Sequence, residues 1–228
     1  MSEPSTFIPV VIQDRLGVDR LRSYLEDCDD DLELALTLYA WNGQIAAAFL
    51  EDLGRLEVVL RNRFNEALTA LVSSSGLPEP WFGHKRLFPG HHGNRTRDDL
   101  TKAKMRATKN GRTPVDQDRV IAEFGFGFWR FLCAPRHLTS LWSPALASQF
   151  PNHPTPVNAI QIRADVESRM DRLHFLRNRV AHHNPIHRRE LAIDAAMILE
   201  LAQWMCLDTH AWMTGHTRIP SVLASRPA

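Results

Sequence analysis

Hydrophobic residues recur at three- and four-residue steps through the first third of the chain, which is the spacing of one apolar face on an α-helix. The clearest run is Leu53, Leu56, Leu60, Phe64, Leu68 and Leu71. Three aspartates at positions 29–31 form a plausible N-cap and acidic first turn ahead of this region. We therefore predict helices over about residues 17–75, with Asn42 and Gly43 as the candidate break between them.

Proline and glycine punctuate the next part of the chain, so we expect a loop-rich connection over about residues 76–112, with a short helix near residues 98–107. A further helix is expected after Thr113, because Pro114 and Asp116 suit its first and third positions. The run FGFGFWRFL that follows suits either a strand or a helix, and we interpret it as core packing.

Two more helices complete the pattern. Asn158 is a candidate N-cap for a helix over about residues 158–183, and a last helix is expected over about residues 187–210. The apolar face of the last helix consists of Leu191, Ala195, Ile198, Ala202 and Met205. Because strands and turns do not alternate anywhere, the sequence predicts one all-α domain over residues 1–228, a helical bundle with additional helices and a long basic connection.

Composition agrees with a folded domain. The 228 residues are 44% hydrophobic and 23% charged, which excludes collagen-like, disordered and disulfide-scaffold classes. Three widely spaced cysteines suit a reducing compartment. The longest apolar run, residues 45–50, is far shorter than the ~20 residues that span a bilayer, and the first residues lack a basic signal-peptide region. We therefore expect a cytoplasmic protein with no membrane partner.

Charge is distributed unevenly, although the net charge is only +1. Residues 1–53 hold eleven acidic and three basic residues, whereas residues 85–112 hold nine basic and two acidic residues, interleaved with His91 and His92. Such a basic stretch either meets a phosphate backbone or forms a solvated surface arm.

One arginine occupies an unusual position on the helix of residues 158–183. On a projection at 100° per residue, Arg177 falls about 20° from Val166, between Met170 and Val180 in the apolar stripe. A buried guanidinium without a partner costs several kcal/mol, so an anion is expected to meet it.

Two histidines follow this arginine. His182 and His183 precede Asn184 and Pro185, and the proline predicts that the helix ends near them. On an ideal helix His182 would point about 140° away from Arg177, so the last turn must unwind or a second chain must contribute to a shared site.

The segment from Arg177 to His183, RNRVAHH, resembles the Arg, Asn, three residues, His signature of HEPN domains. The longer LRNRVAHHNPI is similar to the Abi-like (abortive infection) branch of that superfamily. Blocks at Trp41-Asn42, Leu56–Arg61, Trp81-Phe82 and Phe126–Trp129 resemble the same branch in the same order, so the resemblance covers roughly residues 20–205.

The resemblance implies a HEPN-type bundle and a metal-independent endoribonuclease that acts in bacterial defence or as a toxin. It further implies RNA as the partner, a homodimer with a composite active site, a possible antitoxin or regulatory partner, and no cofactor or metal. Arg177, His182, Asn178 and His183 would then be catalytic: the guanidinium holds phosphate, an imidazole transfers protons, and Asn178 orients the histidine or the ribose. Candidate RNA-binding cations are Lys102, Lys104, Arg106 and Arg179.

A structural alternative remains open. Glu57 also falls in an apolar stripe, so it either forms a buried salt bridge with Arg177 or pairs with Arg61 four residues on. The chain would then be a non-catalytic RNA-binding or protein-interaction module. In a compromise between the two hypotheses, Glu57 supports the site by orienting Arg177 or Arg61.

Other candidate chemistry is weaker. His183 and His187 have the spacing of a zinc pair, but Pro185 lies between them and no cysteine or carboxylate completes the set. His174 lies at the edge of the apolar stripe, where we expect a packing residue. Gly125 and Gly127 do not form a phosphate-binding loop, because no Gly-Lys-Ser or Gly-Lys-Thr follows them.

Overall fold

The computed structural model describes residues 7–77, 80–84, 87–88, 93–154 and 158–227, and these residues contain helices and no strand. The prediction of an all-α bundle is thereby confirmed. The α-helices are α1 (Pro9–Leu16), α2 (Val18–Asp27), α3 (Leu32–Ser74), α4 (Gly93–Ala107), α5 (Gln117–Ala122), α6 (Phe126–Leu132), α7 (Ala159–Ala181), α8 (Leu191–Met205), α9 (Leu207–His216) and α10 (Ile219–Ala224). Short 3-10 or π segments are η1 (Trp81–Gly83), η3 (Pro135–His137), η4 (Leu138–Trp142) and η5 (Leu146–Gln149).

Helix α3 is the spine of the molecule. It has 43 residues, and its N-cap Asp31 accepts hydrogen bonds from the backbone N–H groups of Glu33 and Leu34, as the aspartate run predicts. The expected break at Asn42 and Gly43 is wrong, because the helix continues through both residues. Asn42 is buried there, and its side-chain oxygen accepts a 2.8 Å hydrogen bond from the Ile186 backbone N–H, so a tertiary contact offsets the low helix propensity.

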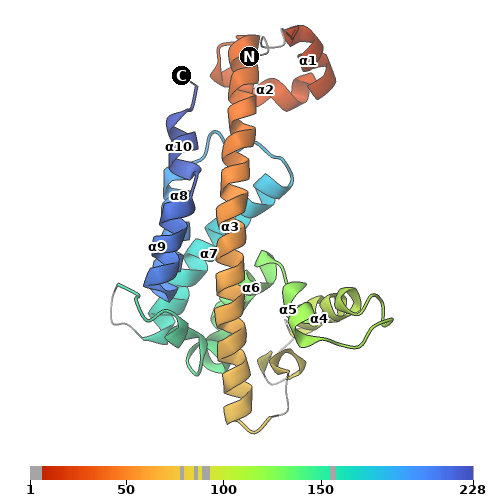
Figure 1. Cartoon of the computed structure of the whole chain (residues 1–228), viewed down its shortest axis with the longest axis vertical. Coiled ribbons are helices and arrows are strands. Elements are labelled where there is room, and N and C mark those ends of the chain that lie inside the picture. Colours follow the sequence, from red (N-terminus) through yellow and green to blue (C-terminus); the bar gives the residue numbers. More distant parts are fainter. Residues whose placement is uncertain (1–6, 78–79, 85–86, 89–92, 155–157, 228) are drawn as a thin grey trace.

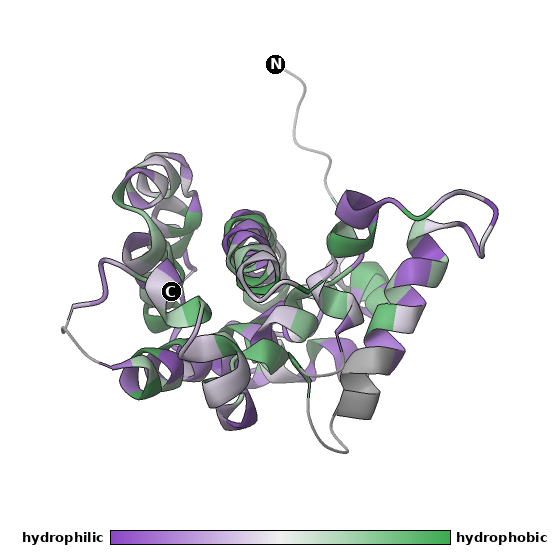
Figure 2. Ribbon diagram, turned by 90° about the horizontal axis from the view of Figure 1, so that it is seen from below, coloured by the Kyte–Doolittle hydropathy of each residue, from purple (hydrophilic) through white to green (hydrophobic). Residues whose placement is uncertain are grey.

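The other helices pack around α3 along its whole length (Figure 1). Helices α1 and α2 lie at its N-terminal end, and α4 and α5 lie beside its C-terminal half. Helices α8, α9 and α10 run along one side, and α7 crosses behind. Seen from below, α3 stands between two groups of helices (Figure 2).

The core next to the functional region is aromatic. Phe64 of α3 makes edge contacts with Trp129, Trp142 and Phe150, at ring-centroid distances of 6.4, 5.9 and 6.1 Å. All four side chains are buried, and Trp142 donates to the Leu132 carbonyl at 2.8 Å. The FGFGFWRFL run therefore packs in the core, as predicted, with its helical part in α6.

Three boundaries differ from the sequence prediction. Helix α1 was not expected, and Asp116 is the N-cap of α5 rather than its third residue. The single last helix predicted over residues 187–210 is also wrong. The observed helix α8 ends at Met205, because Cys206 adopts an extended backbone conformation, and two further helices, α9 and α10, follow it.

The expected helix over residues 158–183 is α7, and Asn158 caps it as predicted, accepting from the backbone N–H groups of Ile160 and Gln161. Of the cysteines, Cys28 and Cys133 are buried and Cys206 is half-buried, and all three are free thiols. No helix in the described ranges is both long enough and apolar enough to cross a membrane.

A buried histidine makes the fold sensitive to acid. His137 is 2% exposed, it contacts the rings of Phe88 and Phe131, and neither of its ring nitrogens has a hydrogen-bond partner among the described residues. Burial lowers its pKa to about 4, because a charged ring would lose its hydration.

We predict that this histidine destabilises the fold between pH 6.5 and 4. In that window the unfolded chain binds a proton at this histidine and the native chain does not. The free energy of unfolding therefore decreases as the pH is lowered, by ~3 kcal/mol from pH 6.5 to pH 4. In His137→Leu this part of the pH dependence should disappear. Urea unfolding of both proteins at pH 7, 5.5 and 4 measures it, and parallel pH curves for the two proteins would contradict the assignment.

Candidate functional site

The C-terminal end of α7 forms a regular helix stop at the two histidines. His182 is the C-cap, and His183 has a φ of 55°, in the left-handed region where glycine is usual. The His183 N–H donates to the Val180 carbonyl at 3.0 Å, and the Asn184 N–H donates to the Arg179 carbonyl at 2.8 Å. These two bonds make a Schellman motif, so α7 does not unwind before its last residue, Ala181.

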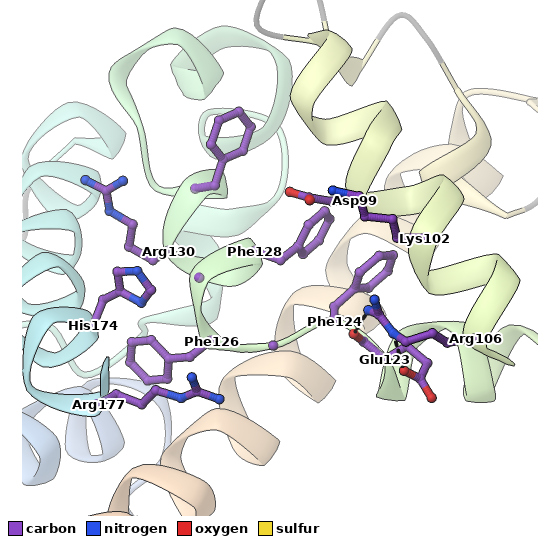
Figure 3. A pocket seen from close by; sticks show the side chains of 13 residues that line it. Asp99, Lys102, Arg106, Glu123, Phe124, Phe126, Phe128, Arg130, His174 and Arg177 are labelled. Carbon is purple, nitrogen blue, oxygen red and sulfur yellow. Dashed lines mark hydrogen bonds and ion pairs between the residues drawn. The ribbon is translucent and has the colours of Figure 1, made fainter. Parts of the chain in front are cut away.

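Arg177 lies in a cleft on the side of α7 that faces α6 and α4 (Figure 3). Val166, Met170, Leu173 and Val180 are buried, as the projection predicts, but Arg177 itself is only half-buried. The cleft has a volume of about 340 Å³. Its charged lining residues are Asp99, Lys102, Arg106, Glu123, Arg130 and Arg177.

Positive charge predominates in this cleft, and it comes from three helices. Arg106 of α4 pairs with Glu123 at 2.7 Å, and Arg130 of α6 pairs with Asp171 of α7. Lys102 and Arg177 form no ion pair or hydrogen bond with another described residue. The cleft therefore offers two cationic groups to an anion without breaking an existing pair.

Glu57 of α3 lies close enough to Arg177 to interact electrostatically, but the two groups do not meet within the 4 Å of an ion pair. Arg61 acts on Glu57 in the same way, and the backbone of Phe126 also favours its charged form. Burial raises the pKa of Glu57, while these three neighbours act against the rise. The salt bridge expected in the structural alternative is thus absent between these described residues, and Glu57 moderates the charge of Arg177 at longer range.

His174 shares the cleft wall with Arg177, one helical turn away, and it is held on three sides. Its ring lies parallel to Phe126, and its Nε2 accepts a 3.2 Å hydrogen bond from the Asn178 side-chain amide. A Cβ at Gly127 would stand 3.0 Å from its Cε1, so only glycine permits this approach. His174 is a packing residue with a satisfied nitrogen, and Asn178, expected beside His182, contacts His174 instead.

The motif histidines lie outside this cleft. His182 is exposed at the end of α7, and His183 lines a second cavity beside α3. One chain therefore does not bring Arg177, His182 and His183 into one pocket. His187, the other member of the candidate zinc pair, is buried against Asp27 and Tyr24.

Only two of the four candidate RNA-binding cations reach the cleft, Lys102 and Arg106. Lys104 lies over the Phe82 ring at 5.6 Å, and Arg179 donates to the Pro185 carbonyl. His91 and His92 of the basic stretch lie outside the described residues.

Arg130 is the cleft residue that sequence reasoning missed. It follows FGFGFW in a run interpreted wholly as core, and its charge was the only signal available. On a seven-residue helix with four buried positions, such a charge has to point outward, here into the cleft.

Comparison with known proteins leaves the family open: we found no match to this chain among protein-family models, curated proteins or solved structures.

We predict that Gly127→Ala lowers the unfolding free energy by ~1 kcal/mol, because an overpacking cost of ~1–3 kcal/mol exceeds the helix-propensity gain of ~1 kcal/mol. Gly215→Ala in α9 is the matched control, since Gly215 is also a helical residue and its added methyl meets no atom within 4 Å. Denaturant unfolding of both variants measures the difference. If the two variants are equally stable, the ring of His174 is not fixed as described.

Proposed function

We propose that this protein is a metal-independent endoribonuclease of the HEPN type, in which the Arg177 cleft binds the phosphate that is cleaved. The observation that carries the proposal is the half-buried guanidinium of Arg177, which has no ion-pair partner among the described residues and faces a cleft with three further cations. The planar fork of arginine suits bidentate binding of phosphate oxygens.

The reaction in this proposal needs only protein groups. The 2′-hydroxyl of the RNA loses its proton to a base and its oxygen attacks the adjacent phosphorus, while the bond to the 5′-oxygen breaks and an acid protonates that oxygen. The products are a 2′,3′-cyclic phosphate and a 5′-hydroxyl. Arg177 and Lys102 stabilise the charge that builds up on the phosphorane, and His182 is the proton-transfer group.

This chemistry requires a second chain, because His182 lies outside the Arg177 cleft of its own chain. A homodimer in which one protomer supplies Arg177 and the other His182 or His183 fits both the helix end and the HEPN resemblance. A cytoplasmic role in bacterial defence or as a toxin, with an antitoxin or regulatory partner, belongs to the same proposal and rests on the resemblance alone.

A second function, a non-catalytic RNA-binding or protein-interaction module, is favoured by the separation of the histidines from the cleft. In this case Arg177 and its neighbours bind RNA, and no bond is cleaved.

The deciding experiment incubates the purified full-length chain with labelled single-stranded RNA in excess EDTA. We expect cleavage with 2′,3′-cyclic phosphate ends, a ~10²- to 10³-fold loss of rate in Arg177→Ala, and a ~10²- to 10⁴-fold loss in His182→Ala. Arg177→Lys should not restore the rate. Lys104→Ala is the control, because Lys104 lies outside the cleft.

Binding of the RNA without cleavage, weakened in Arg177→Ala, would overturn the nuclease and establish the module. Parallel measurement of His183→Ala shows which of the two histidines transfers the proton. Circular dichroism and thermal unfolding of each variant separate loss of chemistry from loss of fold.

A further inference from the structure

One face of α3 is apolar and exposed along four turns of the helix. It consists of Gly43, Ala47, Leu50, Gly54 and Val58, and we refer to it as the α3 face. Leu50 is 49% exposed and Val58 is 44% exposed, which is unusual for a residue of the helix that forms the spine of the fold. In Figure 1 α3 passes in front of α7, and Figure 2 shows other helices on both sides of it.

The five residues of the α3 face form one continuous surface. At 100° per residue they lie within an arc of ~80°. A Cβ placed on Gly43 or on Gly54 would meet no atom within 4 Å, so nothing in the described chain covers these positions.

A cavity of about 400 Å³ adjoins the N-terminal end of the α3 face. Gly43, Ala47 and Leu50 line it from α3, and His183 and Asn184 line it from the end of α7. The apolar surface and one motif histidine are therefore parts of the same depression.

We propose that the α3 face binds the α3 face of a second copy of this chain, with the two helices antiparallel. The reason is that the pattern of side chains complements itself. When Ala47 lies opposite the partner subunit's Gly54, Gly43 lies opposite the partner subunit's Val58, and the two Leu50 side chains meet near the two-fold axis. Each large side chain then faces a glycine or the other leucine, and the partner's Val58 enters the cavity over Gly43.

Charge favours the same antiparallel arrangement. Among residues whose side chains the structure describes, residues 7–53 hold ten acidic and three basic residues, and residues 98–112 hold five basic and two acidic residues. The first group lies at the N-terminal half of α3, and the part of the second group that belongs to α4 lies beside its C-terminal half (Figure 1). Antiparallel pairing brings the acidic end of each protomer to the basic end of its partner, and parallel pairing would place like charges together.

The dimer interface itself does not depend on the proposed function. Its further consequence, the pairing of Arg177 of one protomer with a motif histidine of the other, rests on the proposed ribonuclease. His183 lines the cavity beside Ala47 and Leu50 of α3, whereas Arg177 acts electrostatically on Glu57, farther along the same helix. Because six residues separate Arg177 from His183, their backbones lie only ~9 Å apart along α7. Antiparallel pairing places the part of α3 beside His183 in one protomer opposite the part beside Arg177 in the other, twice per dimer.

The oligomeric state in the absence of RNA tests the interface directly. Light scattering at micromolar concentration should give a mass of twice the 26.0 kDa of one chain. Leu50→Glu and Val58→Glu should both give the mass of one chain, because the first places two acidic groups together near the two-fold axis and the second buries an acidic group over the partner subunit's Gly43. Ile160→Glu is the matched control: Ile160 is 56% exposed on α7, away from the α3 face, and this variant should remain dimeric. A monomeric wild type, or dimers that survive both α3 changes, would overturn the proposal.

Cross-linking tests the register. The double variant Ala47→Cys with Gly54→Cys should form intermolecular disulfides on mild oxidation, whereas Ala47→Cys with Val58→Cys should form far fewer, because those two positions are out of register. Equal yields from both pairs would contradict the antiparallel register.

These measurements distinguish failure of the proposed interface from failure of the proposed ribonuclease. A dimer with the predicted cross-link that fails to cleave RNA leaves the interface intact and refutes the nuclease. RNA cleavage at wild-type rate by monomeric Leu50→Glu refutes the shared site. If both hold, a mixture of Arg177→Ala and His182→Ala chains, each inactive alone, should regain ~one quarter of wild-type activity, since half the dimers are mixed and each has one complete site.

Discussion

Helix α3 has 43 residues, and a helix of this length is stable in water only if an apolar face is buried along it. The positions of the other helices follow from the burial of this face. Helices α2, α7, α8 and α10 all pack against α3, and its buried side chains run from Ala35 to Val72. Each large apolar side chain buried in this way contributes ~1.5–3 kcal/mol. Other helices flank α3 on two sides and α7 crosses behind it, and the face of α3 that points away from them stays in contact with solvent between Gly43 and Val58.

The same spine sets the electrostatics of the candidate site. Glu57 of α3 is influenced by the backbone of Phe126 and by the charge of Arg177, with which it forms no ion pair. Its carboxylate therefore lowers the cost of placing a guanidinium among apolar neighbours while leaving the hydrogen-bond donors of that guanidinium unused. The close approach of α6 to His174, which Gly127 permits, completes the wall of the cleft.

The periodic parts of the sequence predicted the fold well, and for physical reasons. The apolar steps from Leu53 to Leu71, and the stripe of Val166, Met170 and Val180, record which faces must leave water, so they predict α3 and α7 directly. Sequence reasoning failed where a distant partner decides the outcome. The hydrogen bond from the Ile186 backbone N–H to the Asn42 side chain helps to keep α3 continuous, and no residue near Asn42 in the sequence predicts it.

The candidate site was predictable to the same extent. The projection identified Arg177 as a charge in an apolar stripe, but it could not show that α6 and α4 leave a cleft there, and so it expected deeper burial. It also indicated that Arg177 and His182 point apart, and the Schellman motif at His183 confirms that the helix does not unwind to correct this.

In the proposed function, the charge of Arg177 is available to a phosphate group of RNA. The most direct test measures the equilibrium affinity for single-stranded RNA over a series of salt concentrations, for wild type, Arg177→Ala and Arg169→Ala. Arg169 is the control, because it lies on the same helix with its guanidinium paired to Glu200 at 2.7 Å. We expect Arg177→Ala to bind more weakly and to reduce the slope of log affinity against log salt by ~0.7, the value of one phosphate contact, while Arg169→Ala keeps the wild-type slope. An unchanged affinity and slope in Arg177→Ala would contradict the account.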